Sequence, residues 1–469
     1  MSIFIDRESE LSVLHERYRS QSAEFIILYG RRRIGKSELI EQFLASVHGI
    51  RFLAREESRH LQLKKFSLTC ADYFSEDFLK TTSFSDWDGF FSFLAGRAGE
   101  RLVIAIDEFP YLVKEDPSLP SIIQEFWDRN LKNTKIVFIL CGSSISMMEE
   151  LTMQHKSPLF GRRTGQILLN GLRFVDILDY TGDFVHAVQL YSVFGGTPAY
   201  FMGVEKDRSV FVNIAKRILS VDAYLYKDVE FVLRMELSEP RYYFSILLSI
   251  AKGNNRIGLI MNDTGLAKGL ITKYLSVLID LQLVQRKVPV TETQKSRKGL
   301  YVLCDNLFDF WFRFVHPNIE RIERGDGNLV LESTVRPQFS QYVGKHFESI
   351  VEDLFYEFNR AGLLPFRFET IGSWWDKGQE IDLVALRQPD PAILFCECKW
   401  QDAVNADKVL SQLKDKAAGV PWNKENRLEY FCIVARSFSV RCDGADHDDS
   451  ILCLDVDDLA RLHQHCRTG

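Results

Sequence analysis

The stretch EFIILYGRRRIGKSELIEQFLASV, residues 24–47, decides the fold of the N-terminal half. Residues 24–29 form a short apolar run typical of a buried strand, and residues 37–47 repeat apolar side chains at helical spacing. Between them, residues 30–37 fit the pattern GxxxxGK[ST], which is expected to bind phosphates where it follows a strand and opens a helix. Both neighbours are present, so the segment predicts a strand, a phosphate-binding loop and a helix.

The residues of this loop have separate predicted roles in binding a nucleoside triphosphate. Gly30 and Gly35 let the backbone turn its N–H groups, and the positive end of the helix dipole, toward the phosphates. Lys36 is expected to neutralise phosphate oxygens, and Ser37 to offer its hydroxyl to Mg²⁺. We therefore expect ATP and Mg²⁺ as ligands.

A second apolar run, residues 102–106, ends in Asp107 and Glu108. Asp107 is expected to hold the Mg²⁺ shell and Glu108 to orient or deprotonate the attacking water, because phosphoryl transfer depends on positioning and charge neutralisation. A third run, residues 136–141, leads to Ser143, which could contact the γ-phosphate or merely cap a helix. Helical segments separate the runs, so they predict a parallel sheet covered on both faces.

Arg162 and Arg163 are candidates for stabilising charge on the γ-phosphate, in the same chain or from a neighbouring copy. A surface salt bridge is the evenly weighted alternative.

The N-terminal half contains the motifs YGRRRIGKSEL and IDEFPYL and, at residues 195–198, the segment GGTP. Through these motifs, roughly the first 300 residues resemble the archaeal-type ATPases of the AAA-related STAND group. In that group a GxP segment and a winged helix relay the nucleotide state to an effector domain. Gly196 and Pro198 match, although an ordinary turn is the alternative here.

The composition is that of a globular protein with about three domains, with 469 residues of which 46% are hydrophobic and 26% charged. A formal net charge of −6 excludes a chain that is basic throughout, so any nucleic-acid surface must be local. An acidic start and the lack of an apolar run of about 18 residues predict a cytoplasmic protein without a membrane span. The nine cysteines contain no CxxC pair and are expected to be reduced.

The pattern along the chain predicts an α/β multidomain protein with four parts. An α/β ATPase domain at residues 1–205 is followed by a helical and winged-helix region at 206–305, a connecting segment at 306–339 and a second α/β module at 340–469. The polar hairpin at residues 285–299 could be a DNA-contacting wing or simply a solvated hairpin. Its basic residues are Arg286, Lys287, Lys295, Arg297 and Lys298.

In the last module we expect a helix at residues 341–358 and another at 406–416. Strands are expected at residues 366–370, 380–386, 392–398 and 430–435. The acidic stretch 443–449 is expected to be a surface loop.

Two of these strands, predicted to form a hairpin, carry a constellation of two acids and one amine. Glu397 and Lys399 share a strand face because side chains alternate, and pairing with the neighbouring strand can bring Asp382 beside them. Carboxylates that converge need a divalent cation, and oxygen ligands suit Mg²⁺ or Mn²⁺. Lys399 would position the attacking water or stabilise the charge of the transition state. Glu380 lies on the same face as Asp382, so either could bridge the metal.

This constellation resembles the PD-(D/E)xK nuclease superfamily, and the C-terminal third resembles the restriction-endonuclease-like domain, of DUF234 type, that is appended to many such ATPases. The resemblance implies that Glu348, Asp382 and Glu397 bind metal and that Asp382, Glu397 and Lys399 are catalytic, with Gln412 as a possible adjunct. A strand-edge ion pair or an inactive nuclease fold is the alternative.

We therefore expect an ATP-binding and ATP-hydrolysing switch coupled to a divalent-metal-dependent DNA endonuclease, with assembly into homo-oligomers possible. The alternative is an ATP-regulated DNA-binding or signalling protein whose nuclease-like domain is inactive. A helicase-like motor is disfavoured because no second motor-type domain is apparent.

Overall fold

A computed structural model of the chain describes residues 5, 7–20, 22–237, 239–442 and 450–468. By their internal contacts the residues form two compact units. The first unit comprises residues 1–171 with 197–199, and the second comprises residues 172–196 with 200–469. Within the described ranges, no helix is long and apolar enough to cross a membrane.

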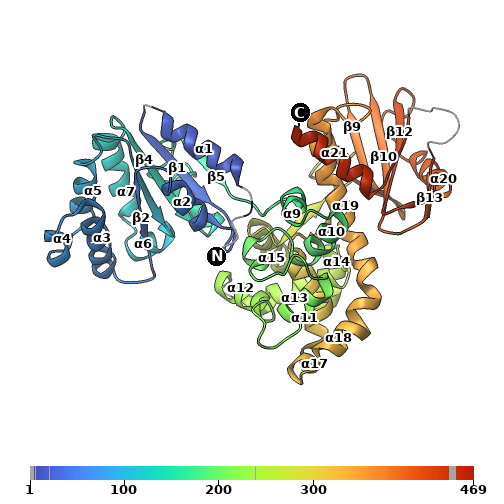
Figure 1. Cartoon of the computed structure of the whole chain (residues 1–469), viewed down its shortest axis with the longest axis horizontal. Coiled ribbons are helices and arrows are strands. Elements are labelled where there is room, and N and C mark those ends of the chain that lie inside the picture. Colours follow the sequence, from blue (N-terminus) through green and yellow to red (C-terminus); the bar gives the residue numbers. More distant parts are fainter. Residues whose placement is uncertain (1–4, 6, 21, 238, 443–449, 469) are drawn as a thin grey trace. The chain divides into compact units, whose positions relative to one another are not determined.

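The first unit contains a five-stranded parallel sheet in the order β2-β3-β4-β1-β5. Every residue of β1, β3 and β4 is buried, because helices cover both faces of the sheet (Figure 1). The predicted parallel sheet is thus confirmed. In chain order the elements are α1 (Glu8–Arg19), β1 (Glu24–Tyr29), α2 (Lys36–Leu44), β2 (Gly49–Leu53), α3 (Arg59–Phe74), α4 (Phe78–Thr81), α5 (Trp87–Ala95), β3 (Leu102–Asp107), α6 (Phe109–Glu115), α7 (Leu119–Phe126), β4 (Ile136–Gly142), α8 (Ile145–Thr152) and β5 (Gly165–Leu168).

Each face of this sheet has its own core. Phe25 and Ile27 of β1 pack with residues of α3, α5, α6 and α7 on one face. Ile26 and Leu28 pack with α1 and α2 on the other, because side chains alternate along a strand. The loop between β1 and α2 is therefore anchored at both ends in packed elements.

The second unit begins with helices and a short antiparallel hairpin. The three helices α13 to α15 and the hairpin of β6 and β7 lie where the sequence predicts a winged helix. The segment 306–339, predicted to connect the modules, is itself helical, and its Phe308, Phe310 and Trp311 are buried. The elements are α9 (Phe174–Thr181), α10 (Phe184–Phe194), α11 (Val210–Arg217), α12 (Asp228–Glu236), α13 (Pro240–Ala251), α14 (Ile257–Thr264), α15 (Lys268–Asp280), β6 (Val284–Lys287), β7 (Leu300–Leu303), α16 (Asn306–Phe310), α17 (Ile319–Glu323), α18 (Gly327–Val330) and α19 (Arg336–Ala361).

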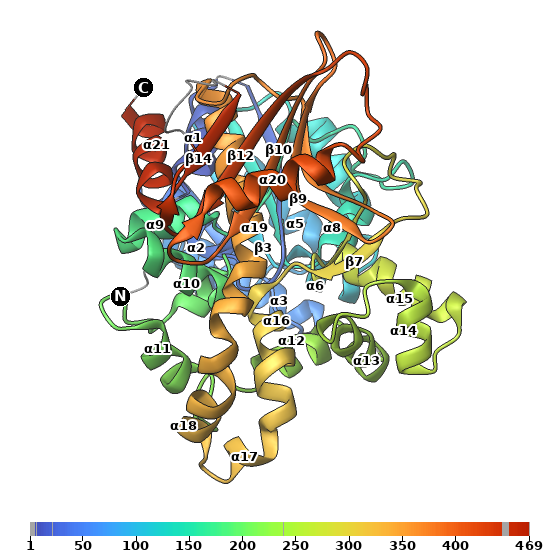
Figure 2. The same cartoon turned by 90° about the vertical axis from the view of Figure 1, so that its right-hand side faces the viewer.

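The remainder of this unit is a mixed five-stranded sheet in the order β14-β12-β10-β9-β8. The pairs β8–β9 and β9–β10 are antiparallel, whereas β10–β12 and β12–β14 are parallel. Helix α20 connects β10 to β12 and covers one face of the sheet (Figure 2), while α19 also packs against β9 and β10. The elements are β8 (Thr370–Asp376), β9 (Gln379–Arg387), β10 (Ala392–Lys399), β11 (Val404–Asn405), α20 (Ala406–Ala417), β12 (Leu428–Ala435), β13 (Phe438–Val440), β14 (Ile451–Leu454) and α21 (Val456–Thr468).

Residues 284–303, which we call the β6–β7 hairpin, pack against β8 at the edge of this sheet. Val290 N donates a hydrogen bond to Ser373 O (3.0 Å). Trp375 Nε1 donates to Lys298 O (3.1 Å). The side chain of Val290 also contacts the apolar core beneath α20. The hairpin is therefore docked rather than freely solvated.

This docking engages two of the five basic residues considered for DNA contact. Lys298 Nζ forms ion pairs with Glu292 Oε1 (3.1 Å) and Asp376 Oδ1 (3.0 Å). Arg286 Nη1 donates to Gln294 O of the same hairpin (2.6 Å). Lys295 and Arg297 remain exposed. DNA contact by this hairpin stays a prediction, but its charge is smaller than the sequence indicates.

Two expectations about the C-terminal module need correction. Residues 366–369 are not a strand, because β8 begins at Thr370. Cys442 and Cys453 form a disulfide, so the expectation of nine reduced thiols is wrong for this pair. Strand β14 and helix α21 were not predicted. The acidic stretch 443–449, predicted as a surface loop, lies outside the described residues.

Asn359 on α19 explains why the approach to β8 is not a strand. Its Oδ1 accepts from Phe368 N (2.9 Å) and its Nδ2 donates to Phe368 O (3.1 Å). Both backbone groups of Phe368 are thus satisfied by a side chain, and the ladder with β9 starts at Thr370.

We expect Asn359→Ala to lower the free energy of unfolding of the second unit by about 1–3 kcal/mol, because both backbone groups of Phe368 lose their partner. Asn359→Asp keeps the acceptor and should lose less. Thermal unfolding of the full chain measures the difference, and a melting temperature equal to that of the wild type would show that these bonds are dispensable.

Candidate functional site

The loop between β1 and α2 has the backbone conformation that its glycines permit. Gly35 has a φ of 92°, a region that favours glycine. A Cβ on Gly30 would lie 2.3 Å from Leu169 O, so only glycine fits there. The loop thereby passes closely under the end of β5 and enters α2 at Lys36.

Lys36 is buried against this loop, with 5% of its surface exposed. Its Nζ donates to Gly30 O (3.0 Å) and to Arg31 O (2.8 Å). The ammonium is therefore held over the curled backbone, where a phosphate chain bound to the loop would meet it.

Ser37 and Asp107 come together from α2 and β3. Ser37 Oγ donates to Asp107 Oδ2 (2.6 Å), and Asp107 is fully buried. Arg51 Nη1, from the neighbouring strand β2, lies 3.1 Å from the same Oδ2 atom. Sequence reasoning missed Arg51, because its closeness to Asp107 depends on the order of the strands. The hydroxyl and carboxylate predicted to share Mg²⁺ are adjacent, and a guanidinium supplies the countercharge.

Glu108 and Ser143 also meet, at the ends of β3 and β4. Ser143 Oγ donates to Glu108 Oε2 (2.8 Å). Glu108 has a φ of 56°, a backbone conformation that non-glycine residues rarely adopt. Ser143 therefore holds the predicted water-orienting carboxylate.

The structure separates the roles of the two arginines. Arg162 forms a two-pronged ion pair with Asp128, with Nη2–Oδ2 and Nε–Oδ1 distances of 2.7 and 3.1 Å. It also donates to Pro158 O (2.8 Å). The alternative of a structural salt bridge thus describes Arg162. Burial raises the pKa of Tyr29, the residue before Gly30, and the charge of Arg163 lowers it, so Arg163 lies within electrostatic reach of the loop.

Pro198 of the GxP segment lies beside the phosphate loop. A Cβ on Gly35 would be 4.0 Å from Pro198 Cγ. Residues 197–199 belong to the first unit, although the residues on either side belong to the second. The segment therefore enters the nucleotide-binding unit beside the residue that opens α2.

A second site lies in the second unit, where Asp382 on β9 meets Glu397 and Lys399 on β10. Lys399 Nζ is 2.5 Å from Glu397 Oε2 and 3.5 Å from Asp382 Oδ2. Asp382 Oδ2 also accepts from Cys398 N (2.8 Å). The ladder between β9 and β10 ends at the pair formed by Leu383 and Cys396. The side chain of Asp382, the residue next to Leu383, therefore extends the contact between the two strands beyond the ladder. The prediction that these three side chains converge is confirmed.

A second lysine at this site was not predicted. Lys416 Nζ, from α20, lies 2.6 Å from Glu397 Oε1. Glu397 is buried, with 3% of its surface exposed, and each of its two carboxylate oxygens lies beside one lysine ammonium. Gln412, the expected contribution of α20, is exposed. The sequence could have predicted Lys416, because it follows Gln412 by four residues, which is the helical spacing that places two side chains on one face.

Glu348, from α19, lies near the other acids of this site. Burial first, and then the negative charges of Asp382 and Glu380, raise its pKa to about 8, although the charges of Lys287 and Lys399 lower it. Burial and the charge of Glu397 likewise raise the pKa of Asp382. Of the two acids on β9, Asp382 contacts Lys399, whereas Glu380 is exposed and pairs with Trp375 of β8.

The three acids do not form a ready metal site. Among the described residues, no three His, Cys, Asp or Glu side chains are grouped as ligands of one metal ion would be. The convergence of Glu348, Asp382 and Glu397 on one ion is thus not seen, because Lys399 and Lys416 lie against the carboxylates instead. The residues nevertheless fit a hard divalent cation, because the side chains of Glu348, Asp382 and Glu397 offer only carboxylate oxygens as donors.

Comparisons with known proteins agree with this division into two parts. A family model described as an ATPase domain predominantly from Archaea matches residues 4–203. A second model, described as archaea bacterial proteins of unknown function, matches residues 311–410. The uncharacterized protein MJECL04 of Methanocaldococcus jannaschii is 35% identical over 468 residues, which is 98% of this chain and 100% of that protein. The chain belongs to the family of MJECL04.

Solved structures resemble this family member in fold. The Walker-type ATPase PABY2304 of Pyrococcus abyssi is 19% identical with a TM-score of 0.50, over 66% of this chain and 96% of that one. The ORC2 protein of Aeropyrum pernix, in its ADPNP–ADP complexes, is 13% identical with a TM-score of 0.40, over 70% and 93% of the two chains. The first unit thus has a P-loop fold like that of the Walker-type ATPase, and it lies within the residues matched by the model of the archaeal ATPase domain.

The raised pKa of Glu348 predicts a pH-dependent stability. Its carboxyl is neutral in the folded chain below about pH 8, whereas in the unfolded chain it ionises near the ordinary value of 4.5. The folded state therefore binds the extra proton between these values, and stability falls as the pH rises through them. Glu348→Gln should raise the melting temperature little at pH 5 but by roughly 5 °C at pH 8.5.

Differential scanning fluorimetry across this pH range measures the effect, with the exposed Glu425→Gln as the control. Adding Mn²⁺ at pH 8.5 should reduce the advantage of the variant, because a bound cation stabilises the ionised wild-type carboxyl. A difference that does not change with pH would contradict the assignment.

Proposed function

We propose that this protein is an ATP-driven switch whose C-terminal domain is a divalent-metal-dependent DNA endonuclease. For the switch, Ser37, Asp107 and Glu108 would hold and activate the reactants of ATP hydrolysis, while Lys36 neutralises the phosphates. The hydrogen bond between Ser37 and Asp107 (2.6 Å) is the observation that carries this part, because these two groups share one Mg²⁺ in P-loop ATPases.

For the nuclease, the supporting observation is that Asp382, Glu397 and Lys399 meet at the ends of two neighbouring strands. Asp382 and Glu397, with Glu348, would hold Mg²⁺ or Mn²⁺. A cation of this kind polarises a phosphodiester and lowers the pKa of bound water. Lys399 would hold the attacking water or the negative charge that develops on the phosphate. Asp382 is fixed for this task by its bond from Cys398 N.

Lys416 supplies a second ammonium to this site, because its Nζ lies 2.6 Å from Glu397 Oε1. In this proposal Lys399 and Lys416 serve as countercharges that keep the buried Glu397 paired when no cation is bound.

Coupling would run through the GxP segment and the winged helix, formed by α13 to α15 and the β6–β7 hairpin. The supporting observation is that Pro198 lies beside Gly35, while the residues flanking the segment belong to the second unit. A change of the loop on nucleotide binding would thereby move a segment that continues into that unit. Arg163, rather than Arg162, is the candidate for sensing the γ-phosphate, and a neighbouring copy in a homo-oligomer could supply the same function.

One observation favours a second candidate, an ATP-regulated DNA-binding or signalling protein with an inactive nuclease-like domain. Both oxygens of Glu397 are already bound by lysines, and such a site could be a purely structural ion-pair network. Metal affinity separates the two candidates. Only the nuclease requires Mn²⁺ binding that depends on Asp382 and Glu397.

Replacing Lys36 by Ala should weaken ATP binding by at least about tenfold, because the buried ammonium over the loop is lost. Glu108→Gln should keep ATP binding and lower the hydrolysis rate by about a hundredfold or more. Fluorescent-nucleotide titration and phosphate release measure the two effects. ATP affinity that is unchanged in Lys36→Ala would contradict the assignment of the loop.

Asp382→Asn and Lys399→Ala should each abolish Mn²⁺-dependent DNA cleavage without unfolding the chain. Asp390→Asn and Lys424→Ala, exposed residues of the same domain, are matched controls that should cut like the wild type. Isothermal titration with Mn²⁺ accompanies the cleavage assay. If wild type and both site variants cut equally, the nuclease assignment is wrong, and if none binds Mn²⁺, the inactive domain is the better description.

A further inference from the structure

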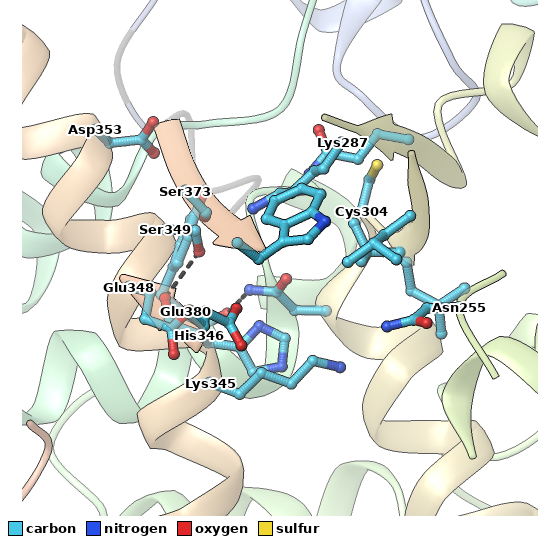
Figure 3. A pocket seen from close by; sticks show the side chains of 17 residues that line it. Asn255, Lys287, Cys304, Lys345, His346, Glu348, Ser349, Asp353, Ser373 and Glu380 are labelled. Carbon is cyan, nitrogen blue, oxygen red and sulfur yellow. Dashed lines mark hydrogen bonds between the residues drawn. The ribbon is translucent and has the colours of Figure 1, made fainter. Parts of the chain in front are cut away.

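The second unit contains a polar pocket of about 460 Å³ between α19, the β6–β7 hairpin and strands β8 and β9. Glu348, Ser349 and Asp353 line it from α19, and Lys287, Cys304 and Asn255 line the facing wall (Figure 3). A second hollow of about 320 Å³ adjoins it and shares Lys287 and Trp375. The two hollows therefore adjoin one another between the hairpin, α19 and β8.

The pocket reaches the acids of the second site. Glu348 lines the pocket, and its carboxyl carries the electrostatic effect of Asp382. Glu380, also in the lining, lies two residues before Asp382 on β9 and pairs with Trp375 on β8. A group held in the pocket would therefore lie beside Glu348 and Glu380, of which Glu348 is one of the proposed metal ligands.

The docked β6–β7 hairpin forms the wall opposite α19 and limits what can enter. It is joined to β8 through Val290 N to Ser373 O and through Trp375 Nε1 to Lys298 O. The ion pair of Lys298 with Asp376 (3.0 Å) closes the same edge. Because these contacts hold the hairpin against β8, a ligand of the pocket would lie between the hairpin and α19.

We propose that the two hollows form a path for one strand of nucleic acid, which seats a single nucleotide in the pocket, and that the site therefore acts on single-stranded DNA and excludes the intact duplex. The proposal rests on the proposed nuclease function and names its substrate class. A pocket of this volume is the size of a small-molecule site. A duplex carries two backbones across a major groove of about 12 Å, and its paired bases are not accessible unless they are extruded.

The lining suits such a strand. Trp375 lines the pocket, and its indole N–H is bound to Lys298 O, so the ring forms a fixed apolar part of the wall. Lys287 forms no ion pair with any carboxylate of the described chain. Burial raises the pKa values of Glu348, Glu352 and Asp353, and the positive charge of Lys287 lowers all three. Its ammonium is thus free to bind a backbone phosphate. The amides of Asn255 and Gln285 can bind base edges.

The first test measures binding without chemistry. Fluorescence anisotropy in EDTA compares a short labelled DNA strand with the same sequence as a blunt duplex, using the full chain. We expect the single strand to bind about tenfold more tightly. Lys287→Ala should remove most of this preference, whereas Lys295→Ala, an exposed lysine of the same hairpin that does not line the pocket, should keep it. Equal affinity for strand and duplex, or an unchanged Lys287→Ala, would overturn the proposal.

The second test asks whether the hairpin must open. A Cβ built on Gly372 lies 3.6 Å from Val290 Cβ, within the usual range for a disulfide, so Val290→Cys with Gly372→Cys should lock the hairpin to β8 on oxidation. The oxidised protein should bind the single strand like its reduced form and like the single variant Val290→Cys. Loss of affinity on oxidation, restored by reductant, would mean that the hairpin is a lid and would overturn the path.

Cleavage with Mn²⁺ then separates this inference from the proposed function. Cutting of the single strand with little cutting of the duplex supports both. Equal cutting of both substrates leaves the nuclease in place and overturns the single-strand path. Strand binding that depends on Lys287 without any cleavage overturns the nuclease and supports the path as a binding site.

Discussion

Buried carboxylates that need a cation dominate the chemistry of both units. In the first, Asp107 is fully buried and Arg51 lies 3.1 Å away. In the second, Lys399 and Lys416 bind the two oxygens of Glu397. An ionised group taken out of water is stable only when it is paired. Each ion pair therefore keeps a carboxylate charged where Mg²⁺ would otherwise be required, and the two sites can fold before any metal arrives.

Much of the first unit could be predicted from the sequence because its signals are local. A buried parallel strand needs apolar residues on both faces, so the strands around Gly30 and Asp107 were visible as continuous runs. The contact of Arg51 with Asp107 could not be predicted, because it depends on which strands are neighbours in the sheet. Arg162 was predicted as a candidate for stabilising the γ-phosphate, but its guanidinium forms an ion pair with Asp128.

The strands that carry the C-terminal site could be predicted from the sequence, whereas the elements that pack around these strands were harder to predict. Alternation along β10 placed Glu397 and Lys399 on one face, as the structure shows. Lys416 and the docking of the β6–β7 hairpin arise from contacts between elements distant in sequence, which no local pattern encodes. The disulfide of Cys442 and Cys453 is likewise set by the placement of β14 rather than by a cysteine motif.

The excursion of residues 197–199 into the first unit has a consequence for how the protein can be dissected. The polypeptide crosses from one unit to the other after residues 171, 196 and 199, so three peptide connections join them. A gene fragment that stops at the first crossing would encode the whole five-stranded sheet yet lack Pro198 beside Gly35. The nucleotide-binding module is thus not one uninterrupted stretch of the gene, and a single protease cut at any crossing would divide at least one unit between two fragments.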